Sequence, residues 1–280
     1  MTRPHIDYLQ SQSLPWKPSP WPYLPGCQHK TLSRDADTGA LSLLVRYPSA
    51  WAAPAPGPLG TSEELFVLEG VLELDGRRYG QDCYGWFPPG WRHAVRATAD
   101  GAVALVFLGA EPVSREAAAT TARRAVEGVL IDAFALAWVA AGPGAGFGAA
   151  AHRSKSLHVA PDGGPATTLI TLPAHLHPPD WRAPQEIHGC AEEVFLLSGD
   201  LVSPAGAMTA GAYCSRPAAV TQGPYASRGG GLALVRTHGT PQSTEHSAHE
   251  LELERAPQYQ PVLPPALRTL AARPWRPQRY

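Results

Sequence analysis

The chain has 280 residues, so it can form one large domain or two ordinary domains, each with its own hydrophobic core. Its formal net charge is -1 and no cluster of Lys and Arg is visible, which argues against a nucleic-acid or anionic-membrane partner. Only 17% of the residues are charged, whereas 27 are Gly and 30 are Pro, a balance typical of short strands joined by turns.

The N-terminal region and the cysteines give no sign of export. Residues 1–26 are rich in proline and lack the apolar stretch of a secretory signal. The four cysteines form no CxxC pair and no dense disulfide framework. Residues 129–142 are the longest apolar stretch, but they contain Asp132 and are too few to span a bilayer. We therefore expect a cytoplasmic protein without a membrane segment.

The first half of the chain reads as a series of short strands. Residues 41–48, LSLLVRYP, form an apolar run before a Pro-rich loop. Residues 64–80, ELFVLEGVLELDGRRYG, predict a hairpin with a bend at Gly70 and a turn at the Asp-Gly pair of residues 75–76. Residues 101–108, GAVALVFL, predict a closing strand.

The second half follows a change in composition. Residues 111–128, EPVSREAAATTARRAVEG, are rich in Ala, Arg, Thr and Glu and predict a linker with one or two helical turns. Residues 167–173, TTLITLP, and 230–237, GGLALVRT, again predict strands. The Pro- and Arg-rich residues 251–280 are expected to pack over the second half or to fray.

The chain carries the same pattern twice. A shift of 129 positions places residues 61–70, TSEELFVLEG, on residues 190–199, CAEEVFLLSG. Ordered matches over such a long stretch indicate duplication of a structural unit. We therefore predict an all-β protein with an N-terminal domain at 1–115, a linker at 116–128, a C-terminal domain at 129–250 and a tail at 251–280. The matched pairs are Glu63 with Glu192, Glu64 with Glu193, Gly70 with Gly199, Tyr84 with Tyr213, and Gly101 with Gly230.

Both copies resemble the cupin superfamily. Its first motif is HxH, three or four residues, Glu, six residues and Gly, and its second is Gly, five residues and PxGxxH. The first copy has Glu63 and Gly70 at this spacing and PPGWRH at residues 88–93. The second has EIHGCAEEVFLLSG at 186–199 and GAYCSRPAAVTQ at 211–222. The whole pattern is similar to that of uncharacterised two-cupin proteins related to the cupin domain of ChrR-type anti-sigma factors.

The resemblance implies two tandem jelly-roll β-barrels in which imidazoles and a carboxylate hold one divalent metal, such as Fe, Mn, Ni, Cu or Zn. The first copy keeps only Glu63 and His93, because Gly57 and Leu59 occupy the HxH positions. We expect it to be a scaffold or an empty binding cup, with His93 hydrogen-bonded inside the barrel mouth.

The second copy keeps more of the ligand set. Glu186 stands at the first histidine position, His188 at the second, Glu192 at the carboxylate position, and Gln222 replaces the closing histidine. This oxygen-rich set favours Mn or Fe(II). The alternative is an ion pair between Glu186 and His188 at the barrel rim, with Gln222 hydrogen-bonded to a loop.

Five further residues remain candidates. His175 or His177 of a Pro-rich loop would join the metal site if that loop folded back, and otherwise lies in solvent. Cys190 is a potential soft ligand or an inert buried thiol. Tyr213 and Arg236 are candidates to bind substrate; the alternatives are a packing role for the tyrosine and a surface salt bridge for the arginine.

The function predicted first is that of a bicupin that binds a divalent metal and a small oxygen-rich ligand. If it is an enzyme, the superfamily suggests a dioxygenase-like cleavage or a lyase or isomerase step on an oxo-acid or a diketone. Loss of ligands in both copies favours the alternative, a non-catalytic binding or regulatory protein without metal. A third hypothesis is that the two barrels form an internal pseudo-dimer whose tail docks another protein. Because cupin barrels pair through exposed edges, a homodimer is also expected.

Overall fold

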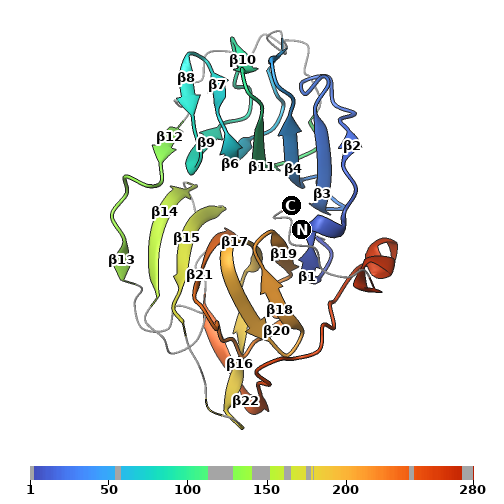
Figure 1. Cartoon of the computed structure of the whole chain (residues 1–280), viewed down its shortest axis with the longest axis vertical. Coiled ribbons are helices and arrows are strands. Elements are labelled where there is room, and N and C mark those ends of the chain that lie inside the picture. The colour runs from blue at the N-terminus through green and yellow to red at the C-terminus, as the bar shows by residue number, and fades with distance from the viewer. Residues whose placement is uncertain are drawn as a thin grey trace. The chain divides into compact units, whose positions relative to one another are not determined.

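The computed structural model describes residues 3–53, 58–112, 129–140, 152–160, 165–174, 178, 180–239, 243–272 and 280. Their regular elements are strands (Figure 1), apart from the short 3-10 helices η1 (Ser11–Ser13) and η3 (Pro265–Ala272). The predicted all-β class is therefore confirmed. Within the same residues, no helix is long and apolar enough to cross a membrane.

Two compact units make up the chain, and their boundaries differ from those predicted at 1–115 and 129–250. One unit contains Pro15–Leu136, and the other combines Arg3–Leu14 with Ala137–Tyr280. The N-terminal residues thus belong to the second unit, whereas residues 129–136 belong to the first. The predicted linker at 116–128 lies outside the described residues.

Two antiparallel sheets form the first unit. Its strands are β2 (Lys17–Pro18), β3 (Gln28–Arg34), β4 (Leu41–Tyr47), β5 (Trp51–Ala53), β6 (Glu63–Gly70), β7 (Leu72–Leu74), β8 (Arg77–Tyr79), β9 (Cys83–Phe87), β10 (Arg96–Thr98), β11 (Ala102–Leu108) and β12 (Val129–Asp132). The larger sheet has the order β12-β9-β6-β11-β4-β3-β2, and the smaller has the order β5-β10-β7-β8. Residues of both sheets share one hydrophobic core. The predicted hairpin is present, with its turn at Asp75 and Gly76.

The second unit is built from the same kind of strands. They are β1 (Ile6–Gln10), β13 (Val139–Ala140), β14 (Arg153–Val159), β15 (Ala166–Leu172), β16 (Arg182–His188), β17 (Ala191–Ser203), β18 (Gly206–Thr209), β19 (Ala212–Arg216), β20 (Thr221–Gln222), β21 (Gly231–His238) and β22 (Thr244–Glu252). The larger sheet has the order β1-β19-β17-β21-β15-β14-β13, with β18 paired to β17, and the smaller has the order β20-β16-β22.

The strand order supports the duplication. The series β9-β6-β11-β4-β3 in the first unit corresponds to β19-β17-β21-β15-β14 in the second. The next strand in each sheet explains the shifted boundaries. β12 pairs with β9 and β1 pairs with β19, so each unit takes an edge strand from the segment that precedes the other unit. Figure 1 shows β1, in blue, beside the orange β19.

Two pairs of glycines repeat the same close backbone contact. Gly70 and Gly199 have φ of 75° and 78°, in the left-handed region that favours glycine. A Cβ atom on Gly70 would lie 2.1 Å from the carbonyl oxygen of Gly101, and one on Gly199 would lie 1.9 Å from that of Gly230. Both matched positions therefore require glycine, because a side chain there would collide with the neighbouring backbone.

Candidate metal and ligand site

Three strands of the second unit bring the four predicted metal ligands together. Glu186 and His188 lie at the end of β16, and Glu192 follows at the start of β17. Gln222, on β20, pairs in register with Glu186. All four residues are buried. The structure thus gathers the predicted donors, while their role as metal ligands stays a prediction.

His188 lies at the centre of this cluster. Its Nε2 lies 3.5 Å from Glu186 Oε2, and its Nδ1 lies 3.4 Å from Glu192 Oε2. Nε2 of Gln222 lies 2.8 Å from the same Nδ1. Burial alone lowers the pKa of His188, but hydrogen bonds and charge from the two carboxylates raise it to about 9. The raised pKa favours a protonated imidazole between the two carboxylates at neutral pH, a state in which the Gln222 amide nitrogen cannot donate to Nδ1.

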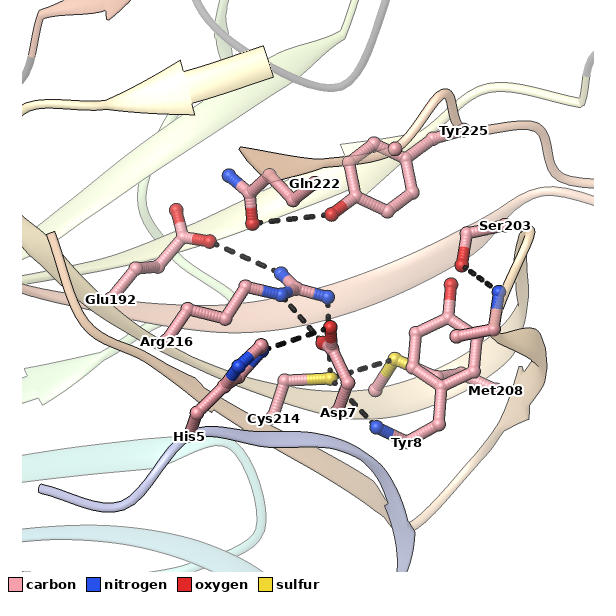
Figure 2. A network of polar contacts seen from close by, with 12 residues as sticks. His5, Asp7, Tyr8, Glu192, Ser203, Met208, Cys214, Arg216, Gln222 and Tyr225 are labelled. Atoms are coloured by element: carbon pink, nitrogen blue, oxygen red, sulfur yellow. Dashed lines mark hydrogen bonds and ion pairs between the residues drawn. The ribbon is translucent and has the colours of Figure 1, made fainter. Parts of the chain in front are cut away.

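A buried arginine, Arg216 of β19, lies beside the cluster (Figure 2). It donates from Nε to Asp7 Oδ1 at 2.6 Å and from Nη1 to Glu192 Oε1 at 3.5 Å. Its guanidinium carbon lies 5.6 Å from the ring centroid of Tyr225, whose hydroxyl donates to Gln222 Oε1 at 3.2 Å. Burial raises the pKa of Asp7, but the charge of Arg216 helps to lower it to about 2. The network therefore contains an ion pair between Arg216 and Asp7, which lies on the N-terminal strand β1.

Sequence reasoning did not identify Asp7, Arg216 or Tyr225. The repeat contained a signal for two of them, because the same shift of 129 positions places Arg216 on Phe87 and Tyr225 on Arg96. A charged residue in one copy opposite an aromatic residue in the other marks a position that has changed its role. Asp7 left no comparable signal, since its strand pairs with a distant part of the chain.

The two residues predicted to bind substrate lie in another cluster. Tyr213 Oη donates to Glu193 Oε1 at 2.6 Å, and Arg236 Nη1 donates to Glu193 Oε2 at 3.4 Å. Arg3 Nη1 and His238 Nε2 lie 2.7 Å and 3.0 Å from the same carboxylate. Successive residues of a strand point to opposite faces, so Glu193 faces away from the four donors described above. Tyr213 and Arg236 therefore lie in a cluster separate from these donors, and their role in substrate binding stays a prediction.

The first unit has a different cluster around Glu63. Arg96 Nη2 donates to Glu63 Oε1 at 3.0 Å, and His93 Nε2 lies 3.3 Å from Glu63 Oε2. His93 Nδ1 also lies 2.9 Å from Asp75 Oδ2. Arg96, Glu63 and His93 are all buried. A guanidinium and an imidazole thus occupy the oxygens of the carboxylate that the cupin resemblance assigns to a metal, which supports the predicted scaffold role.

Of the remaining candidates, the structure describes Leu59 and Cys190. Leu59, at one lost histidine position, packs in the core of the first unit. Gly57, His175 and His177 lie outside the described residues. Burial and, to a smaller extent, Glu192 raise the pKa of the Cys190 thiol. A protonated, buried thiol is the expected inert form of this cysteine.

Glu63 makes the first unit sensitive to acid. Burial raises the pKa of this carboxyl, but Arg96 and His93 lower it overall from 4.5 to about 2. A depressed carboxyl pKa adds stability above the unfolded value, and this contribution is lost as the pH falls from about 4.5 toward 2. We expect Glu63 to account for a loss of roughly 2 to 3 kcal/mol in the free energy of unfolding between pH 7 and pH 2.5.

Urea titrations of wild type and Glu63→Gln at both pH values measure this contribution. The variant should be less stable at pH 7 and should lose less stability on acidification. Equal pH dependence in both proteins would show that Glu63 has an ordinary pKa.

The donor set of the second unit fits a divalent ion in its chemistry. An imidazole, two carboxylates and an amide oxygen suit Mn or Fe(II). The cluster contains three carboxylates, those of Asp7, Glu186 and Glu192, and one permanent cation, Arg216. When His188 is neutral, its net charge is therefore two negative charges, which a divalent ion would balance. Both ring nitrogens now face carboxylates, however. Among the described residues, no group of three or more His, Cys, Asp or Glu side chains is already arranged to hold a metal.

Comparisons with known proteins agree on the fold. The sequence profile of DUF4437, a domain of unknown function, matches residues 14–243. No curated protein matches the chain significantly. Among solved structures, a candidate dioxygenase from Nostoc punctiforme is similar with a TM-score of 0.75 and 19% identity, over 89% of this chain and 92% of that one.

Two further structures extend the comparison. A candidate glyoxylate-induced protein from Pseudomonas aeruginosa has a TM-score of 0.59 at 15% identity, over 91% of this chain and 94% of its own. A variant of oxalate decarboxylase from Bacillus subtilis, an enzyme with Mn(II) centres, has a TM-score of 0.56 at 11% identity, over 86% and 79%. All three are cupin-type proteins, and at these identities the likeness shows the fold alone.

Proposed function

Because the chain belongs to the DUF4437 family and has the cupin fold, we propose that its second unit binds one divalent metal ion and a small oxygen-rich ligand. In this proposal each unit is a jelly-roll barrel, and Glu186, His188, Glu192 and Gln222 hold the ion in the second. The observation that carries the proposal is the meeting of these four buried donors from three strands around His188.

The other residues of the network have supporting roles in this proposal. As a Lewis acid, the ion would polarise an oxygen atom of the ligand. Tyr225 donates a hydrogen bond to Gln222 Oε1 while Gln222 Nε2 faces His188, so the amide has to turn before its oxygen can bind the ion. Arg216 balances part of the negative charge of the cluster. A dioxygenase-like cleavage, or a lyase or isomerase step on an oxo-acid or a diketone, is the proposed reaction class, which the names of two structural neighbours support.

The second candidate function is a binding or regulatory cupin without metal. Three contacts favour it: each ring nitrogen of His188 lies beside a carboxylate, and Arg216 Nη1 lies 3.5 Å from Glu192 Oε1. With His188 protonated, these contacts leave one uncompensated negative charge in the cluster without an ion. The two functions therefore differ in one measurable property, the metal content of the second unit.

Elemental analysis of protein purified without chelator tests the proposal. We expect about one Mn or Fe per chain in wild type and only traces in His188→Ala, because the variant removes the central donor. His93→Ala is the matched control, since it removes the buried histidine beside the motif glutamate of the first unit, and it should keep the metal. Traces in all three proteins would exclude the metal site and leave the second candidate.

A further inference from the structure

The N-terminal strand fixes a carboxylate inside the second unit. β1 pairs with β19, and the backbone N–H of Asp7 donates to the carbonyl of Val262 at 2.9 Å. The neighbouring Tyr8 accepts a hydrogen bond from the Tyr259 hydroxyl at 2.7 Å on its carbonyl oxygen. Asp7 is therefore held from two sides, and its side chain is aimed at Arg216.

Arg216 is shared unequally between two carboxylates (Figure 2). Its Nε lies 2.6 Å from Asp7 Oδ1, whereas its Nη1 lies 3.5 Å from Glu192 Oε1. A charge-assisted hydrogen bond is strongest below about 2.9 Å, so the guanidinium is held mainly by Asp7. The contact with Glu192 is at the limit of a hydrogen bond.

The first unit gives the contrasting case. Arg96 donates from Nη2 to Glu63 at 3.0 Å, and its Nε and Nη1 have no hydrogen-bond partner in the described part of the chain. Among the residues that the structure describes, no second carboxylate pairs with this guanidinium. In the first unit, Glu63 is therefore bound directly by Arg96.

We propose that Asp7 is a positioning residue that holds Arg216 back from Glu192 and thereby preserves the affinity of the second unit for a divalent cation. This inference rests on the function proposed above. Without the negative charge of Asp7, the guanidinium would close on Glu192, which is the remaining carboxylate within its reach. The cation would then compete with Arg216 for that carboxylate.

Titration of chelator-treated, full-length protein with Mn²⁺, followed by electron paramagnetic resonance, tests this role. We expect Asp7→Asn to weaken Mn²⁺ binding about tenfold. Asp200→Asn is the matched control, because Asp200 pairs with Arg228 Nε at 2.8 Å in the same unit and is as little exposed as Asp7. It should bind Mn²⁺ as wild type does. In a protein that already carries Arg216→Gln, adding Asp7→Asn should change the Mn²⁺ affinity less than about threefold, because the residue through which Asp7 acts is gone.

Crystal structures of Asp7→Asn and wild type without metal provide a readout that does not depend on Mn²⁺. The variant should show Arg216 in direct contact with Glu192 at a shorter distance than in wild type. An unmoved guanidinium, or an equal Mn²⁺ affinity of Asp7→Asn and wild type, would overturn the positioning role while leaving the proposed metal site intact. Absence of Mn²⁺ binding in wild type itself would overturn both.

Discussion

Arg96→Met is expected to lower the free energy of unfolding by about 3 to 5 kcal/mol, the usual cost of removing one partner from a buried ion pair. Arg96 is fully buried and contributes the only guanidinium described at Glu63. Methionine fills a similar volume, so the loss arises mainly from the uncompensated carboxylate. Urea unfolding at pH 7 measures the effect.

The double variant Glu63→Leu with Arg96→Met provides the control. Replacing both charges by apolar side chains removes the uncompensated carboxylate, so much of the lost stability should return. His93 keeps its contact with Asp75 in this variant. If Arg96→Met alone costs less than about 1 kcal/mol, the typical effect of a point mutation, the buried pair does not have the energetic role assigned to it.

Deletion of residues 2–10 is expected to prevent stable folding of the second unit. The deletion removes the buried side chains of Ile6, Tyr8 and Leu9, each contributing roughly 1.5 to 3 kcal/mol. It also removes Arg3 from Glu193 and Asp7 from Arg216, which leaves buried charges without these partners. The combined loss should approach the whole stability of a typical domain.

Hydrogen exchange followed by mass spectrometry locates the effect of this deletion. Fast exchange should appear in the peptides of β17 and β19, while those of β4 and β11 in the first unit should stay protected. A synthetic peptide of residues 1–14 should restore part of the protection. Normal protection of β19 in the deletion variant would show that β1 is dispensable.

Local sequence signals predicted the most apolar strands, at residues 41–48, 64–80, 101–108, 167–173 and 230–237, but not the pairing of the edge strands. The shift of 129 positions located Glu63 and Glu192 at the starts of β6 and β17, and the glycines at the same backbone bend. These features depend on neighbouring residues. The exchange of β1 and β12 between the units depends on pairing across long separations, and nothing in strands of five and four residues specifies which sheet edge they join.

The candidate site was predictable for the same reason. The resemblance to the cupin motifs indicated Glu186, His188, Glu192 and Gln222, and the first three lie close together in the sequence on two successive strands. The ion pair between Arg216 and Asp7 could not be predicted, because it forms only through the tertiary pairing of β1 with β19.

We expect the second unit, and not the first, to hold a divalent ion. Anomalous X-ray diffraction from a crystal grown with Mn²⁺ tests it most directly. We predict one peak about 2.0 to 2.3 Å from donor atoms of Glu186, His188 and Glu192, with Gln222 beside it and no peak near Glu63. A peak at Glu63, or none in the second unit, would show that the second unit does not hold the ion in the proposed way.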